Sequence, residues 1–174
     1  MNPLHTLAEL LRGGGAQPLF SPERLAPSTI YDLQYRLAIT ACAFELHAKS
    51  DLVNTRRIRA ATLKLLQFVA IRPWLVPVLQ EWAASQRHPQ FSLLASQRLR
   101  RGFVGDVTYE AVIAFLVARR VLVRVGSHLV SGQNVDALTP FYTAAVEHSL
   151  FAAERRVLQK LVDVKITNSM LEGW

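Results

Sequence analysis

The clearest hydrophobic pattern in the chain runs from residue 108 to residue 132. In TYEAVIAFLVAR, at 108–119, apolar residues recur with the three-to-four-residue period of a helix. The following stretch, VLVRVGSHLVSG, has a short apolar run on each side of Gly126 and Ser127, which predicts a hairpin with a glycine-first type II′ turn. A helix followed directly by a small hairpin is typical of a winged helix.

The predicted turn also sets the register of the hairpin. Arg124 is expected to face Leu129, and Val123 to face Val130. Side chains alternate between the two faces of a strand, so one face of the hairpin should be rich in valine. We expect that face to turn toward the helices; its members are Val121, Val123, Val125 and Val130.

Helical patterns cover most of the remaining chain. One helix is expected over 28–48, capped by Ser28 or Thr29, and a second from just after Asn54 or Thr55 to the residue before Pro73. A shorter helix at 73–85 and a helix or broken helix pair from Thr139 to about residue 162 follow, with a last turn near the end. Residues 91–101 fit either a helix or a strand.

These elements predict a mainly α fold. We expect an N-terminal helix and flexible arm over 1–27, set apart by three glycines and three prolines. A single helical domain should occupy 28–174 and include a winged-helix-like module at about 91–132, which ends in the short β-hairpin.

Composition narrows the functional classes. Hydrophobic residues make up 51% of the chain, but no uncharged apolar run reaches the roughly 18 residues of a membrane span, so we expect a soluble protein without a membrane partner. Cys42 is the lone cysteine, which excludes a disulfide framework and fits a reducing cytoplasm, so we expect a cytoplasmic protein. The five histidines lie far apart, and there is no paired-carboxylate or phosphate-loop pattern. We therefore expect no catalytic residue, metal or cofactor.

The net charge of +7 makes a polyanion a plausible partner. Basic residues are spread along the chain rather than gathered in one run, so solvated faces, or contacts to an acidic protein, are an equally good interpretation. The candidates for nucleic-acid contact are Arg56, Arg59, Lys64, Arg100, Arg101, Arg119, Arg120 and Arg124.

The helix at 108–119 carries unexpected side chains for a DNA-reading helix. On a helical wheel Tyr109, Val112, Ile113 and Leu116 cluster inward. Base recognition needs Arg, Lys, Asn or Gln on the outer arc, but that arc holds one acid and otherwise apolar groups. It suits a second protein, unless another helix of the same chain covers it. The candidate partner-binding residues are Ala111, Ala114, Phe115 and Ala118.

The stretch LRRGFVGDVTYEAVIAFLVARRVLVRV, from Leu99 to Val125, resembles the middle-component subunits of bacterial ABC-three-component systems, a group that includes Lamassu-type anti-phage defence. The matching positions are Arg100, Arg101, Gly102, Asp106 and Tyr109, while Phe103 stands where the family often has proline. The preceding helices and the C-terminal helical segment are similar in layout, so the resemblance covers about three quarters of the chain.

This resemblance implies a non-enzymatic accessory subunit. Such a subunit would bridge an SMC/Rad50-like ABC ATPase and an effector, commonly a nuclease, in a complex directed against phage or plasmid DNA, with duplex DNA as a further partner through the complex. The alternative is a DNA-binding winged-helix regulator that uses Arg119, Arg120 and Arg124 at the wing.

Overall fold

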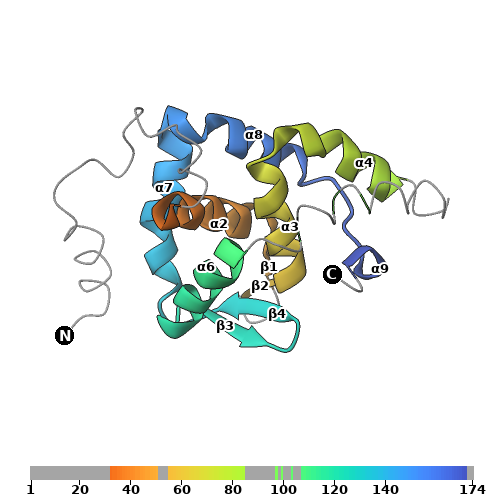
Figure 1. The fold of residues 1–174 in the computed structure, drawn as a ribbon. Coiled ribbons are helices and arrows are strands. Elements are labelled where there is room, and N and C mark those ends of the chain that lie inside the picture. Colours follow the sequence, from red (N-terminus) through yellow and green to blue (C-terminus); the bar gives the residue numbers. More distant parts are fainter. Residues whose placement is uncertain are drawn as a thin grey trace.

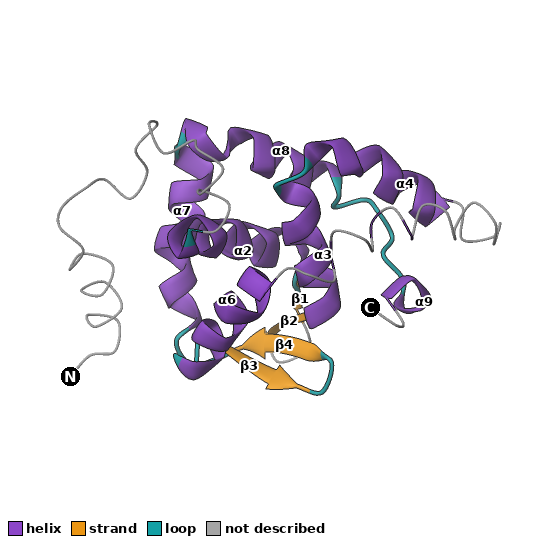
Figure 2. Cartoon of the chain, viewed as in Figure 1, coloured by secondary structure: helices purple, strands orange, loops and turns teal. Residues whose placement is uncertain are grey.

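The computed structural model describes residues 32–50, 55–84 and 107–171, together with Gln97, Leu99 and Phe103. Within these residues the fold is mainly helical, with one small antiparallel sheet at one end of the helical body (Figures 1 and 2). The predicted fold class is confirmed. The N-terminal arm expected at 1–27 and most of the ambiguous stretch at 91–101 lie outside the described residues.

Helix α2 (Leu33–His47) is the central element of the core. Asp32 caps it by accepting hydrogen bonds from the backbone N–H groups of Gln34, at 2.8 Å, and Tyr35, at 3.2 Å. The helix therefore begins later than expected, and Ser28 and Thr29 lie outside the described residues. Every residue from 35 to 44 is buried. Apolar and small residues make up most of this buried stretch, as a helix surrounded on all sides requires, and Arg36 and Thr40 are its polar members.

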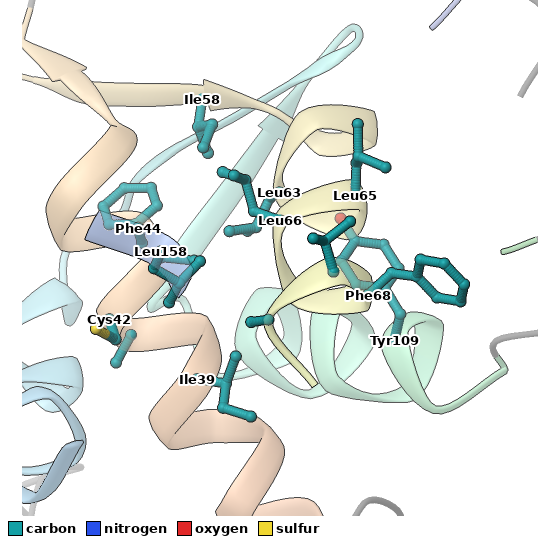
Figure 3. Packing of buried hydrophobic residues seen from close by; sticks show 14 of the residues in the cluster. Ile39, Cys42, Phe44, Ile58, Leu63, Leu65, Leu66, Phe68, Tyr109 and Leu158 are labelled. Atoms are coloured by element: carbon teal, nitrogen blue, oxygen red, sulfur yellow. The ribbon is translucent and has the colours of Figure 1, made fainter. Parts of the chain in front are cut away.

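Five helical elements pack directly against α2: α3 (Ala60–Ala70), α6 (Val107–Ala118), η5 (Val135–Leu138), α7 (Thr139–Glu147) and α8 (Ala152–Lys160). The other helical elements of the described residues are η3 (Pro73–Leu75), α4 (Val76–Ala84), η6 (Ser149–Phe151) and α9 (Asn168–Leu171). The predicted break in the C-terminal helix occurs at His148, whose extended backbone separates α7 from η6. Figure 3 shows side chains of α2, α3 and α8 meeting in one apolar core that also includes Ile58 and Tyr109.

The sheet has the strand order β1-β2-β4-β3 and is antiparallel throughout. Its strands are β1 (Lys49–Ser50), β2 (Arg56–Arg59), β3 (Leu122–Val125) and β4 (His128–Ser131). The sequence-based assignment of 56–59 to a helix is wrong. Pairing with β4 stabilises the extended form, and the alternation of Ile58 with its arginine neighbours buries the isoleucine, so α3 begins only at Ala60.

The order α2, β2, α3, α6, β3, β4 gives a winged-helix-like arrangement. Its third strand, β2, comes from outside the 91–132 segment expected to form this module, because β2 joins the hairpin through β4. The hairpin register is confirmed: Arg124 pairs with Leu129, and Val123 with Val130. Gly126 has a φ of +58° and Ser127 has a negative φ, as a type II′ turn requires.

The expectation that the valine face turns toward the helices is wrong for the strands of the hairpin. Val123 and Val125 are 44% and 58% exposed, whereas Leu122 and Leu129 are completely buried. Leu129 pairs with the buried Ile58 of β2, and this side of the sheet packs on the core. The hairpin register is compatible with burial of either face, and β2 together with the larger leucine side chains determines which one is buried.

Hydrogen bonds and a close backbone contact hold the end of α6 against the hairpin. Arg120 has a φ of +56°, and the N–H groups of Arg120 and Val121 donate to the carbonyls of Val117 and Leu116, which closes the helix with a Schellman motif. Gly132 donates its N–H to the carbonyl of Val121 at 2.9 Å. A Cβ atom on Gly132 would lie 2.2 Å from the carbonyl oxygen of Arg120, so the close approach requires glycine.

Candidate functional site

Helix α6 has one buried face and one face that the described residues leave uncovered. The four residues predicted to point inward are buried, at 4% exposure or less: Tyr109, Val112, Ile113 and Leu116. On the outer arc Ala111, Ala114 and Ala118 are exposed, and Phe115 is half-buried. The guanidinium carbon of Arg119 lies 5.7 Å from the centre of the Phe115 ring. The predicted division of the helix into two faces is confirmed, and the outer arc is a shallow apolar surface.

Tyr109 is a structural residue rather than a reactive one. Its hydroxyl donates a 2.6 Å hydrogen bond to the backbone carbonyl of Ala60, which ties α6 to the start of α3. Burial is the main cause that raises the pKa of this phenol, and the nearby carboxylate of Glu110 raises it further. The hydroxyl therefore stays protonated at neutral pH and is occupied as a donor.

A small cavity of about 130 Å³ lies between α3 and α6, with Lys64, Glu110 and Arg124 on its lining. The ammonium group of Lys64 is 3.4 Å from the Glu110 carboxylate, and it lies 4.8 Å and 5.6 Å from the ring centres of Phe103 and Tyr109. Lys64 thus already has an anion and two aromatic rings as neighbours. It is less available to a nucleic acid than the sequence suggested.

Arg56 is engaged even more completely within the fold. Its guanidinium forms an ion pair with Glu45 at 2.6 Å and donates to the carbonyls of Phe44, at 3.1 Å, and Glu45, at 2.8 Å. It also lies 5.2 Å from the centre of the Phe44 ring. Arginine commonly satisfies the last carbonyls of a helix in this way. We therefore remove Arg56 from the candidate nucleic-acid contacts.

The remaining predicted basic residues divide between different places. Arg120 is exposed at the end of α6, and Arg124 is exposed on β3, on the side of the sheet that faces α6. Arg59 is half-buried at the end of β2, on the opposite side of the sheet. Arg100 and Arg101 lie outside the described residues. The six candidates that the structure describes do not converge on one surface.

The outer face of the sheet brings the predicted candidate Arg59 together with three residues that the sequence-based selection missed, Lys49, Arg57 and His128. Lys49 on β1 lies directly opposite Arg57 on β2, and His128 on β4 lies directly opposite Arg59. Arg57 and Arg59 are two residues apart, so their side chains emerge on the same side. The signal was present in the alternating stretch RRIR at 56–59, which a helix assignment concealed. We call Lys49, Arg57, Arg59 and His128 the cationic sheet face.

Cys42 is buried in α2, and His47 is half-buried at its end. Burial raises the pKa of the Cys42 thiol to about 11, so it is a thiol rather than a thiolate at neutral pH. His47 has its Nε2 atom 3.0 Å from the carbonyl oxygen of Leu158. Burial lowers the pKa of His47, opposed by this hydrogen bond. Within the described ranges no group of three His, Cys, Asp or Glu side chains is placed to hold a metal ion.

Membrane-spanning potential is limited in the part of the chain that the structure describes. No single helix there is long and apolar enough to cross a bilayer, and the segments Ala60–Ala70 and Pro73–Ala84 reach that length and hydropathy only together, across a bend of 115°.

Comparison with known proteins finds no relative: no family model, no curated protein and no solved structure matches the chain.

Proposed function

We propose that this chain is a non-enzymatic accessory subunit that docks a partner protein on the outer arc of α6. The observation that supports the proposal is the uncovered apolar surface of Ala111, Ala114, Phe115 and Ala118. Glu110 is the one charged residue in this twelve-residue helix. Helices that are apolar on all sides are normally buried. An exposed apolar arc on such a helix is therefore expected where a partner protein binds.

The composition of the arc favours a protein partner over DNA bases. Three small alanines permit close approach of a second helix, and the half-buried Phe115 offers a ring at the centre of the contact. Base recognition in the major groove requires donors such as Asn, Gln, Arg or Lys, which the arc lacks. Arg119, the nearest cation, already lies over the Phe115 ring.

The resemblance of residues 99–125 to the middle components of ABC-three-component systems supplies the identity of the proposed partner. In that setting the outer arc of α6 contacts the SMC-like ABC ATPase, and other surfaces of the chain contact the effector. The chain then acts as a bridge in a defence complex directed against phage or plasmid DNA.

Purification of the chain from its native host, with mass spectrometry of the subunits that co-purify, tests this proposal, and an SMC-like ABC ATPase is the expected partner. Ala114→Arg adds a long charged side chain at an exposed position and should abolish the complex without affecting folding. Phe115→Asp should also abolish the complex, but it lowers stability as well, because Phe115 packs partly against the core. Ala153→Arg, at an exposed alanine of α8, is the matched control and should leave the complex intact. A complex that tolerates Ala114→Arg would refute docking on this arc, and sequence-specific binding of the isolated chain to one duplex would favour the regulator instead.

A further inference from the structure

The cationic sheet face has a geometry that the strand register fixes. Lys49, Arg57 and Val130 lie side by side across β1, β2 and β4, and Arg59 and His128 form the next row. Neighbouring strands are about 4.8 Å apart, and residues i and i+2 of one strand are about 6.6 Å apart. The separation between Arg57 and Arg59 is therefore comparable to the distance between consecutive phosphates of a nucleic-acid strand.

The cations of this face have no counter-charge within the described ranges. Lys49, Arg57 and Arg59 form no ion pair there, in contrast to Arg56 and Lys64. Like charges directly opposite one another in a sheet destabilise the pair, so the placement of Lys49 against Arg57 costs folding free energy. An anion bound between the two strands would remove that repulsion.

The same residues line a cleft of about 270 Å³. Its lining includes Lys49, Arg57, Arg59 and His128, with the Thr62 hydroxyl and the His47 imidazole beside them, and none of its described lining residues is acidic. Guanidinium groups bind phosphate through paired hydrogen bonds, and lysine adds a mobile point charge. The cleft thus combines charge, hydrogen-bond donors and a concave shape.

The side chains beside these cations indicate which kind of nucleic acid the face binds. Proteins that bind single strands add aromatic rings on which bases stack. Among the described residues, the cleft lining has no aromatic ring other than the imidazoles, and the rest of this sheet face consists of Val123, Val125 and Val130. Phosphate contacts without stacking or base-edge donors are the pattern of sequence-independent binding to the backbone of a duplex.

We infer that the outer face of the sheet binds the phosphate backbone of duplex DNA, with Lys49 and Arg57 holding one phosphate, and Arg59 and His128 holding the next. This site differs from the one that a winged-helix regulator would use, since it involves neither α6 nor Arg124, which lies on the other side of the sheet. It is also independent of partner docking on α6, so either idea stands if the other fails.

Fluorescence anisotropy with a short mixed-sequence DNA duplex, titrated with the full chain at several salt concentrations, tests the inference. Each phosphate contact contributes about 0.9 to the slope of log K against log salt, or roughly eightfold in affinity at 0.1 M salt. The double variant Lys49→Gln/Arg57→Gln removes both cations from one phosphate, so it should weaken binding by about that factor and reduce the slope by about 0.9. Arg57→Gln alone should give a smaller loss in the same direction, because Lys49 remains at that phosphate.

Two controls separate a specific contact from a general change in charge. Arg156→Gln removes one exposed positive charge from α8 and should change affinity by less than twofold. Arg57→Lys keeps the charge and should retain the salt slope. Equal losses for Arg57→Gln and Arg156→Gln, with both variants showing unchanged thermal unfolding, would overturn the inference.

Competitors distinguish the sources of the anion. Inorganic phosphate at the same total phosphate concentration should displace little of the duplex, because one ion replaces only one of the paired contacts. Equal displacement by inorganic phosphate would reduce the site to a single-ion pocket and overturn the proposal. Polyglutamate that binds more tightly than the duplex, with Arg57→Gln abolishing that binding, would assign the face to an acidic protein instead.

Discussion

Arg56 and Arg57 are neighbours in the chain, yet they lie on opposite faces of one strand. Arg56 is held by Glu45, two backbone carbonyls at the end of α2 and the ring of Phe44. Arg57 is exposed opposite Lys49 and has no ion-pair partner among the described residues. Arg56, on the inner face of the sheet, stabilises the fold, whereas Arg57, on the outer face, is exposed to solvent. A count of basic residues therefore says little until each one is assigned to a face.

The largest expected effect is a loss of stability caused by a substitution on the inner face of the sheet. Leu129 is completely buried, so Leu129→Ala should lower the free energy of unfolding by about 3 to 4 kcal/mol through lost apolar burial and the cavity that remains. Val125→Ala, at a position 58% exposed, should change it by less than about 0.5 kcal/mol. Urea unfolding measures both, and similar losses for the two variants would mean that the faces are not as distinct as described.

Substitution of Gly132 tests the close backbone contact between this residue and the end of α6. In Gly132→Ala the new methyl group would meet the Arg120 carbonyl oxygen at 2.2 Å, and the backbone must shift, at a cost of about 3 kcal/mol. Gly126→Ala meets no atom within 4 Å and pays only for its positive φ, at about 1 kcal/mol. Thermal unfolding of the two variants compares them. A smaller loss at Gly132 than at Gly126 would contradict the close contact.

The paired arginines give the most direct comparison. Arg56→Gln removes an ion pair and two hydrogen bonds from partly buried groups, and the unfolding free energy should fall by about 2 kcal/mol. Arg57→Gln relieves its repulsion with Lys49 and should leave stability within about 0.5 kcal/mol of the parent, or raise it slightly. Chemical denaturation at low salt provides the measurement. A reversed order of the two effects would refute the division into a structural and an available charge.

The smallest expected effect concerns pH. His47 lines the outer cleft, and burial lowers its pKa in the folded state below the ordinary value of 6.5, so the folded protein favours the neutral imidazole. Above pH 6.5 this residue imposes no penalty. Stability should fall as the pH drops below 6.5 and should level off once the folded-state pKa is passed.

His47→Gln is the matched variant for this effect. It should show a shallower loss of unfolding free energy between pH 7 and pH 5 than the parent protein, because it cannot take up a proton in the unfolded state. Thermal unfolding at a series of pH values supplies the comparison. An identical pH dependence in the two proteins would show that another group is responsible.

Local signals in the sequence were sufficient for some elements. The period of α6, its division into inner and outer residues, the glycine-first turn and the pairing of Val123 with Val130 were all predicted, since each depends on residues close together in the chain. The resemblance to a conflict-system subunit, and the bridging role that it implies, stays a prediction. Among the candidate site residues, those on the outer arc of α6 lie together on one surface, as the wheel predicted.

The predictions that failed concern contacts between distant segments. Residues 56–59 form a strand because β4, about seventy positions further along the chain, offers backbone hydrogen-bonding groups there. The cationic sheet face was missed for the same reason, since it exists only once β1, β2 and β4 are paired.

The sequence by itself determined which residues form the helix and hairpin and which of their side chains share a face, because helix period, strand alternation and turn geometry are local properties. Only the tertiary structure decided which hairpin face is buried and which of two adjacent arginines has no ion-pair partner among the described residues. Those outcomes depend on β2 and α2, whose positions relative to the hairpin are set by the burial of Ile58, Leu122 and Leu129 in a common core.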